Sequence, residues 1–136
     1  MANITSSAVL LRTADGKYLF QQRDKYAPKS PNMIATFGGH LETGESPIEC
    51  LKRELWEELE LKILPPVECL GVLPQREGEN NFVVLYIISD IVKDKLKLHE
   101  GRAIVELSAE EALQDDAVHY LVRDALKLMK QLGRKV

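Results

Sequence analysis

The chain has 136 residues, the length of one domain, and its 45% hydrophobic and 29% charged residues are ordinary for a globular protein. Its 18 Lys and Arg and 21 Asp and Glu give a formal net charge of −3, which argues against binding to nucleic acid polymers, because that affinity rests largely on basic residues at phosphates. The longest apolar run, residues 82–88, is far shorter than the ~20 residues of a membrane-spanning helix. Because the chain also lacks a basic, secretion-type start, we expect one cytoplasmic domain over residues 1–136 with no membrane partner.

The first part of the chain predicts a hairpin followed by a loop. Asp15 and Gly16 lie between two apolar segments and are typical of a hairpin turn, because glycine adopts positive φ without steric cost. The next stretch contains Pro28 and Pro31 and is expected to form a loop over residues 24–32. We therefore predict strands at residues 8–11, 18–23 and 33–37.

A well-marked helix follows. Ser46 is a suitable N-cap, Pro47 suits the first helical position, and Glu49 completes a capping box. The apolar residues after the cap recur with helical spacing and form one stripe: Ile48, Leu51, Leu55 and Leu59. Because proline cannot continue a helix, this helix must end before Pro65.

The second half of the chain predicts three further strands and more helix. The strands are expected at residues 68–73, 82–92 and 103–107, with Gly78 and Asn80 in the turn between the first two. Ser108 and Glu111 resemble a second capping box. A helical repeat of apolar residues then runs up to Gly133: Val118, Leu121, Val122, Ala125, Leu126, Met129 and Leu132. The pattern predicts an α/β domain with a central sheet and at least two helices.

Three carboxylates gather on the helix that starts after Ser46. Glu54, Glu57 and Glu58 are three and four residues apart, which places them in a sector about 100° wide beside the apolar stripe. Like charges at this spacing oppose the helix by roughly 0.2–0.5 kcal/mol per pair. We expect Arg53 to point elsewhere, so a hard divalent cation such as Mg²⁺, which prefers oxygen ligands, is the natural counter-charge.

Two neighbouring features fit the same site. Gly38 and Gly39 would let the backbone turn sharply and offer a carbonyl to the metal. Glu45 can return toward Arg53 and form a bidentate carboxylate–guanidinium pair. Taken singly, these features have ordinary explanations: a solvated acidic face, a turn and two surface charges. Their order in one short block favours the metal site.

This block resembles the Nudix box of the Nudix hydrolase family (MutT-like), whose pattern is G-x5-E-x7-R-E-U-x-E-E-x-G-U with U an aliphatic residue. From Gly39 to Leu61, eight of the nine specified positions match. The ninth is Glu60, where the family usually has a glycine that ends the helix with positive φ. A glutamate there predicts a cost of about 1 kcal/mol or a different helix ending.

The resemblance implies the Nudix fold, an α/β/α sandwich around a central mixed β-sheet. It also implies Mg²⁺- or Mn²⁺-dependent hydrolysis of the diphosphate linkage in a nucleoside diphosphate derivative. The substrate would be a nucleotide-type small molecule: a nucleoside triphosphate, a nucleotide sugar or an ADP-ribose-like compound. The alternative hypothesis is a catalytically weak, Nudix-like module that binds a nucleotide without hydrolysing it.

Residue roles follow from the resemblance position by position. The implied metal ligands are Glu54, Glu57, Glu58 and a carbonyl of Gly38 or Gly39. Arg53, paired with Glu45, would orient the acidic residues. The general base would be either Glu57 or Glu100, which lies just before the last predicted strand. The expected substrate-binding residues are Arg23, Gly39 and His40. The C-terminal amphipathic helix could also pair with a second copy of the chain and form a homodimer.

Overall fold

The computed structural model describes residues 3–63, 67–76 and 80–136. Within these ranges the strands are β1 (Asn3–Thr13), β2 (Tyr18–Gln22), β3 (Ile34–Ala35), β4 (Phe37–His40), β5 (Glu68–Pro74), β6 (Asn81–Ile91) and β7 (Ala103–Leu107). The helices are α1 (Pro47–Leu59), α2 (Ala109–Gln114) and α3 (Tyr120–Gln131), with a short 3-10 helix η1 (Lys93–Lys95). No helix in the described parts of the chain is long and apolar enough to cross a membrane.

β1 lies at the centre of a mixed sheet. The strand order is β3-β2-β1-β6-β5, while β4 pairs with β1 and β7 pairs with β2 outside that path. β1 and β6 run parallel, with Ala8 opposite Leu85, whereas the other paired strands are antiparallel. The hairpin between β1 and β2 turns at Gly16, as predicted. The expected α/β class with a central mixed sheet is confirmed.

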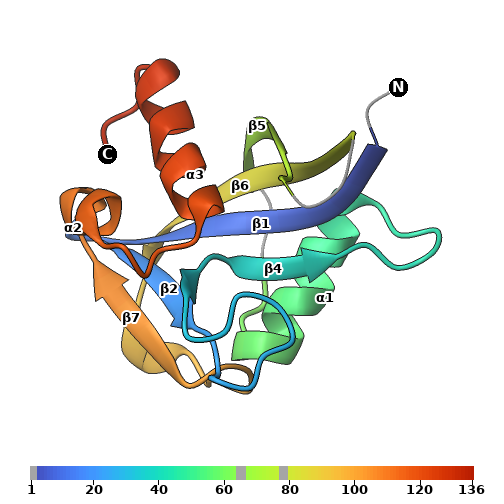
Figure 1. Cartoon of the computed structure of the whole chain (residues 1–136), viewed down its shortest axis with the longest axis horizontal. Helices are drawn as coiled ribbons and strands as arrows, with labels where there is room; N and C mark the ends of the chain where they lie inside the picture. The colour runs from blue at the N-terminus through green and yellow to red at the C-terminus, as the bar shows by residue number, and fades with distance from the viewer. Residues whose placement is uncertain (1–2, 64–66, 77–79) are drawn as a thin grey trace.

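Helices cover both faces of this sheet, with α3 and α1 on opposite sides of β1 (Figure 1). Successive side chains of a strand point to opposite faces. Leu10 of β1 therefore packs in the core beneath α2 and α3, and Leu11 packs in the core beneath α1. The α1 side of the sheet buries three leucines of the predicted helical stripe: Leu51, Leu55 and Leu59. The result is the α/β/α sandwich that the resemblance implied.

Both ends of α1 are set by local backbone chemistry. The Ser46 hydroxyl accepts the Glu49 N–H at 3.2 Å, and the Glu49 carboxylate accepts the Ser46 N–H at 3.0 Å, which confirms the capping box. At the other end, Glu60 has a φ of 52° and donates its N–H to the Trp56 carbonyl at 2.9 Å. The helix therefore ends where the glycine of the pattern would end it, and a glutamate takes the left-handed conformation.

The last helix begins later than its periodicity predicted. Val118 fits the helical repeat, but it lies before α3 and forms an isolated bridge with Ile34. α3 begins at Tyr120, after the N-cap His119. Val118 is fully buried, so its apolar side chain belongs to a strand-like contact. Helical spacing alone does not tell such a residue from a residue of the helix. The turn expected at Gly78 lies outside the described residues.

Candidate functional site

Three carboxylates from two separate segments meet beside the C-terminal half of α1. Oxygen atoms of Glu54, Glu58 and Glu100 lie within 4.8 Å of one another. The first two are one turn apart on α1, and Glu100 belongs to the segment that leads into β7. This segment is docked on the helix, because the His99 N–H donates to the Glu58 carbonyl at 2.8 Å. We call these three side chains the carboxylate cluster.

Glu58 is the most deeply buried member of the cluster, with 1% of its surface exposed. One carboxylate oxygen accepts the Gly38 N–H at 3.1 Å, and the other accepts the Gln21 side-chain amide at 3.4 Å. Burial, reinforced by the negative charge of Glu100, raises the pKa of Glu58 to about 9. Sequence reasoning missed Gln21, although an amide inside the apolar strand β2, where it is buried, was a usable signal.

Glu54 lies between a glycine and an arginine. A Cβ at Gly39 would lie 2.4 Å from the carboxylate carbon of Glu54, so a larger residue there would push the carboxylate aside. On its other side, Arg53 Nη1 donates to Glu54 Oε1 at 2.8 Å. Burial nevertheless raises the pKa of Glu54, with the charges of Glu57 and Glu100 acting in the same direction. Two of the three cluster carboxyls are therefore costly to ionise without an added cation.

Arg53 ties the loop before α1 to the carboxylates. Its Nε and Nη2 donate to the two carboxylate oxygens of Glu45 at 2.7 and 2.9 Å, and Nη2 also donates to the His40 carbonyl at 3.1 Å. The bond from Arg53 lowers the pKa of Glu45 to about 2. The expectation that Arg53 points away from the helix acids is wrong. Its Nη1 contacts both Glu54 and Glu57, because one guanidinium carries five N–H donors.

The two glycines belong to a strand and not to a turn. Gly38 and Gly39 pair with Ala8 and Ser7 of β1, so the predicted sharp turn is wrong. Gly38 has a φ of 139°, and a Cβ there would lie 2.2 Å from the Ser7 carbonyl oxygen, so glycine is needed for this close approach. The contact that Gly38 makes with the cluster is its N–H bond to Glu58, and its carbonyl stays a predicted metal ligand.

Three other expected site residues lie outside the cluster. The Glu57 side chain is 55% exposed, and its carboxylate lies 3.4 Å from Arg53 Nη1. Arg23 Nε donates to the Lys29 carbonyl at 2.9 Å, within the loop before β3. His40 is exposed at the end of β4. The metal role of Glu57 and the substrate roles of Arg23 and His40 stay predictions.

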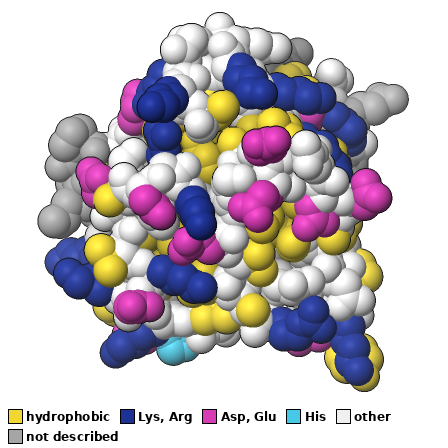
Figure 2. All heavy atoms as spheres, turned by 90° about the vertical axis from the view of Figure 1, so that its left-hand side faces the viewer, with side chains coloured by type: hydrophobic (Ala, Val, Ile, Leu, Met, Phe, Trp, Pro, Cys, Tyr) yellow, Lys and Arg dark blue, Asp and Glu magenta, His cyan; other side chains and the backbone are white. Residues whose placement is uncertain are grey.

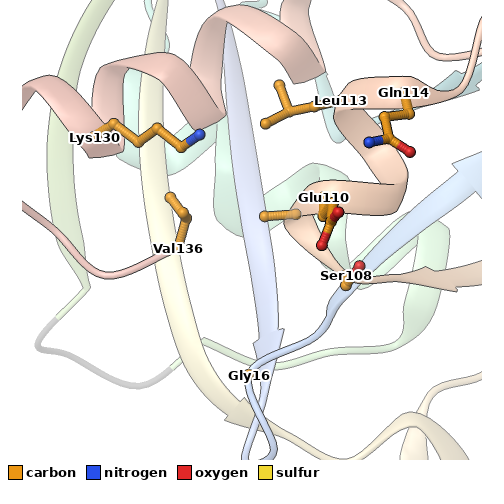
Figure 3. A pocket seen from close by; sticks show the side chains of 8 residues that line it. Gly16, Ser108, Glu110, Leu113, Gln114, Lys130 and Val136 are labelled. Atoms are coloured by element: carbon orange, nitrogen blue, oxygen red, sulfur yellow. The ribbon is translucent and has the colours of Figure 1, made fainter.

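Two hollows of the surface lie away from the carboxylate cluster. One, of about 510 Å³, lies between the turn at Gly16, α2 and α3, and Figure 3 shows Glu110 and Lys130 among its lining side chains. The other, of about 490 Å³, is lined by residues that include Lys52 and Trp56 of α1. On the face shown in Figure 2, Lys and Arg side chains are mixed with Asp and Glu and do not gather in one patch. Neither hollow brings several carboxylate oxygens together as the cluster does.

The donor set of the cluster fits a hard divalent cation. Mg²⁺ and Mn²⁺ prefer oxygen ligands, and Mg²⁺ is commonly held by a few carboxylates together with substrate phosphates. Glu58 and Glu54 both have raised pKa values, because burial and neighbouring acids disfavour their charged forms. A divalent cation would offset that penalty and favour the charged forms of Glu54 and Glu58.

The chain matches a known protein family in sequence and known proteins in fold. The sequence pattern of the NUDIX domain matches residues 2–129. The fold is similar to the MutT protein from Methanosarcina mazei Go1, with a TM-score of 0.80, 22% identity and 98% of each chain covered. It is also similar to the E. coli ORF135 protein, with a TM-score of 0.70, 29% identity, and 97% of this chain and 92% of that chain covered.

A third similar structure is a bifunctional NMN adenylyltransferase/ADP ribose pyrophosphatase from Francisella tularensis. Its TM-score is 0.71 at 15% identity, with 96% of this chain and 41% of that chain covered. No curated protein sequence matches the chain. Because the family pattern covers nearly the whole chain and the solved structures share its fold, the chain belongs to the NUDIX domain family.

Proposed function

We propose that this NUDIX protein is a Mg²⁺- or Mn²⁺-dependent hydrolase that cleaves the diphosphate linkage of a nucleoside diphosphate derivative. The observation that carries the proposal is the meeting of Glu54, Glu58 and Glu100 within 4.8 Å. Burial and neighbouring acids make Glu54 and Glu58 costly to ionise. A diphosphate is itself anionic, so a cation shared between it and these acids would stabilise both. When bound, the metal would neutralise the phosphates and lower the pKa of a bound water.

The residues of the chain would hold the metal and position the attacking water. Glu54 and Glu58 are the proposed central ligands, with the Gly38 carbonyl beside them. Arg53 orients Glu54 through a hydrogen bond of 2.8 Å. Glu57, one residue before Glu58, would complete the ligand set from the solvent side.

The general base is proposed to be Glu100 or Glu57. Glu100 lies within the carboxylate cluster, so it could accept a proton from a water held between the acids. Glu57 is on the exposed side of the same helix and could accept a proton from a water that arrives with the substrate. Either carboxylate would take one proton from the water as the oxygen attacks phosphorus.

The proposed substrate is a nucleotide-type small molecule, contacted by Arg23, Gly39 and His40. Gly39 already lies against Glu54, and the His40 carbonyl is bound to Arg53, so two of these residues lie beside the proposed metal ligands. The similar protein from Francisella tularensis is a bifunctional NMN adenylyltransferase/ADP ribose pyrophosphatase. An ADP-ribose-like compound is therefore one candidate, together with nucleoside triphosphates and nucleotide sugars.

A substrate panel with and without Mg²⁺ tests the proposal. The panel contains nucleoside triphosphates, dinucleoside polyphosphates, nucleotide sugars and ADP-ribose, with release of phosphate or nucleoside monophosphate as the readout. Turnover should require Mg²⁺, stop in EDTA and be lost in Glu58→Gln while that variant keeps its fold. Binding of a nucleotide without any metal-dependent turnover would overturn the enzymatic proposal and favour the nucleotide-binding module.

A further inference from the structure

Glu60 departs from the family pattern and occupies a left-handed conformation with a φ of 52°. This region is costly for a residue with a Cβ. The other non-glycine residues with positive φ in the described parts of the chain are Ser, Asn or Asp, with short polar side chains, and Asn and Asp in particular tolerate it. Glycine would end the helix without this strain, so the glutamate side chain must offer something that glycine lacks.

That contribution is a contact with the segment that carries Glu100. Glu60 Oε2 lies 2.5 Å from His99 Nε2. Beside this contact, the His99 N–H donates to the Glu58 carbonyl at 2.8 Å, and the Lys97 N–H donates to the Leu59 carbonyl at 3.0 Å. The Glu60–His99 contact is thus the side-chain part of one junction between the end of α1 and the segment before β7.

Glu100 lies between this junction and a second anchor. On the far side, the Arg102 N–H donates to the Gln22 carbonyl at 2.8 Å, next to the β2–β7 pairing. Between the two anchors, Glu100 faces two further acids, because one of its carboxylate oxygens lies within 4.8 Å of an oxygen of Glu54 and of an oxygen of Glu58. Carboxylates at this distance repel one another in the ionised form that a cation requires, and this repulsion favours movement of Glu100 away from the helix.

We propose that the Glu60–His99 pair is a positioning clamp that holds Glu100 against this repulsion, so that the carboxylate cluster is assembled before a cation arrives. The inference rests on the proposed metal site and adds to it two residues that would touch neither the metal nor the substrate. It also explains the departure at position 60, because glycine would relieve the strain but lose the clamp.

Direct titration with Mn²⁺ in the absence of substrate tests the clamp, with the paramagnetic resonance signal of free Mn²⁺ as the readout. His99→Ala and Glu60→Gly should each raise the Kd for Mn²⁺ about tenfold, the low end of the loss seen when outer-shell partners of a metal site are removed. The double variant should bind no more weakly than either single variant, because each already removes the same contact. Thermal unfolding of Glu60→Gly should not occur at a lower temperature than in the wild type, because the strain is removed with the contact.

His99→Ala distinguishes a positioning role of the Glu60–His99 pair from simple attraction of Mn²⁺ by the negative charge of Glu60. Removing the imidazole leaves the negative charge of Glu60 in place, so through-space attraction alone predicts Mn²⁺ binding that is unchanged or tighter. Glu68→Gln is the matched control, because it breaks another exposed carboxylate pair, with Arg134, and should leave the Kd unchanged.

The clamp and the proposed metal site can fail separately. If Glu58→Gln loses Mn²⁺ binding but His99→Ala and Glu60→Gly bind as tightly as the wild type, the clamp is refuted and the metal site stands. If Glu58→Gln itself binds Mn²⁺ as the wild type does, the metal site is refuted and the clamp falls with it.

Discussion

Replacing Glu58 with glutamine should make the metal-free protein more stable and should at the same time abolish its stabilisation by Mg²⁺. The pKa of Glu58 is raised from 4.5 to about 9, chiefly by burial. An acid with a raised pKa binds more protons in the folded state than in the unfolded state. The free energy of unfolding of the metal-free protein should therefore fall as the pH rises from 4.5 toward 9. Glutamine keeps the shape and can still accept the Gly38 N–H, but it does not titrate.

The magnitude follows from the same pKa values. Neutral pH is about 2.5 units above the pKa of Glu58 in the unfolded state, so the carboxyl is ionised there, whereas in the folded state it keeps its proton. Each pH unit corresponds to about 1.36 kcal/mol. In metal-free buffer, Glu58→Gln should thus raise the free energy of unfolding by about 3 kcal/mol. Mg²⁺ at about 100 times its Kd should stabilise the wild type by about 2.7 kcal/mol and leave the variant unchanged.

Urea unfolding in EDTA and in Mg²⁺, repeated across this pH range, measures both effects. Glu57→Gln is the matched control, because Glu57 is adjacent but 55% exposed, and its free energy of unfolding in EDTA should change by less than about 0.5 kcal/mol. A Glu58→Gln variant less stable than the wild type in EDTA, or one with the same pH dependence as the wild type, would refute the reasoning.

Three further predictions concern catalysis, acid stability and helix capping. The kcat values of Glu57→Gln and Glu100→Gln, measured at saturating Mg²⁺, should differ. The kcat of the variant that lacks the general base should fall about 10²–10⁴-fold. A normal kcat in both variants would place the base elsewhere. The pKa of Glu45 is lowered from 4.5 to about 2 by Arg53, so the stability from this pair is present above pH 4.5 and is lost as the pH falls toward 2. Glu45→Gln should accordingly be less stable than the wild type at neutral pH, with the two urea midpoints converging in acid; a constant difference would contradict the assignment. Ser46→Ala removes the N-cap of α1 and should lower the free energy of unfolding by about 1 kcal/mol, measured by urea unfolding, whereas no loss would show that the cap contributes little.

Features whose partners are close in the sequence were predictable. The capping box of Ser46 and Glu49 formed because its two partners are three residues apart, a distance fixed by one turn of helix. Glu54 and Glu58 lie together for the same reason, since residues four apart share a helix face. The end of α1 was predictable in position, but the pattern did not say whether Glu60 would accept strain or move the ending.

Features that join distant segments were not predictable in the same way. Glu100 joins the cluster because backbone hydrogen bonds hold its segment against α1. The residues around Glu100 contain no sequence signal for these hydrogen bonds. Gln21 of β2 reaches Glu58 on the helix that covers the sheet, and Gly38 proved to be a strand residue because β4 pairs with β1. Glycine pairs signal turns so often that local sequence favours the wrong structure here.

By itself, the sequence determined the family, the α/β class and the row of acids on α1, because these depend on residue spacing along one chain and on hydrophobic periodicity. Only the tertiary structure decided which acids meet, that Glu100 joins Glu54 and Glu58 while Glu57 lies outside the cluster, and that Glu60 contacts His99. The physical reason is that burial and long-range pairing depend on how the sheet and helix pack, and a one-dimensional pattern does not contain those distances.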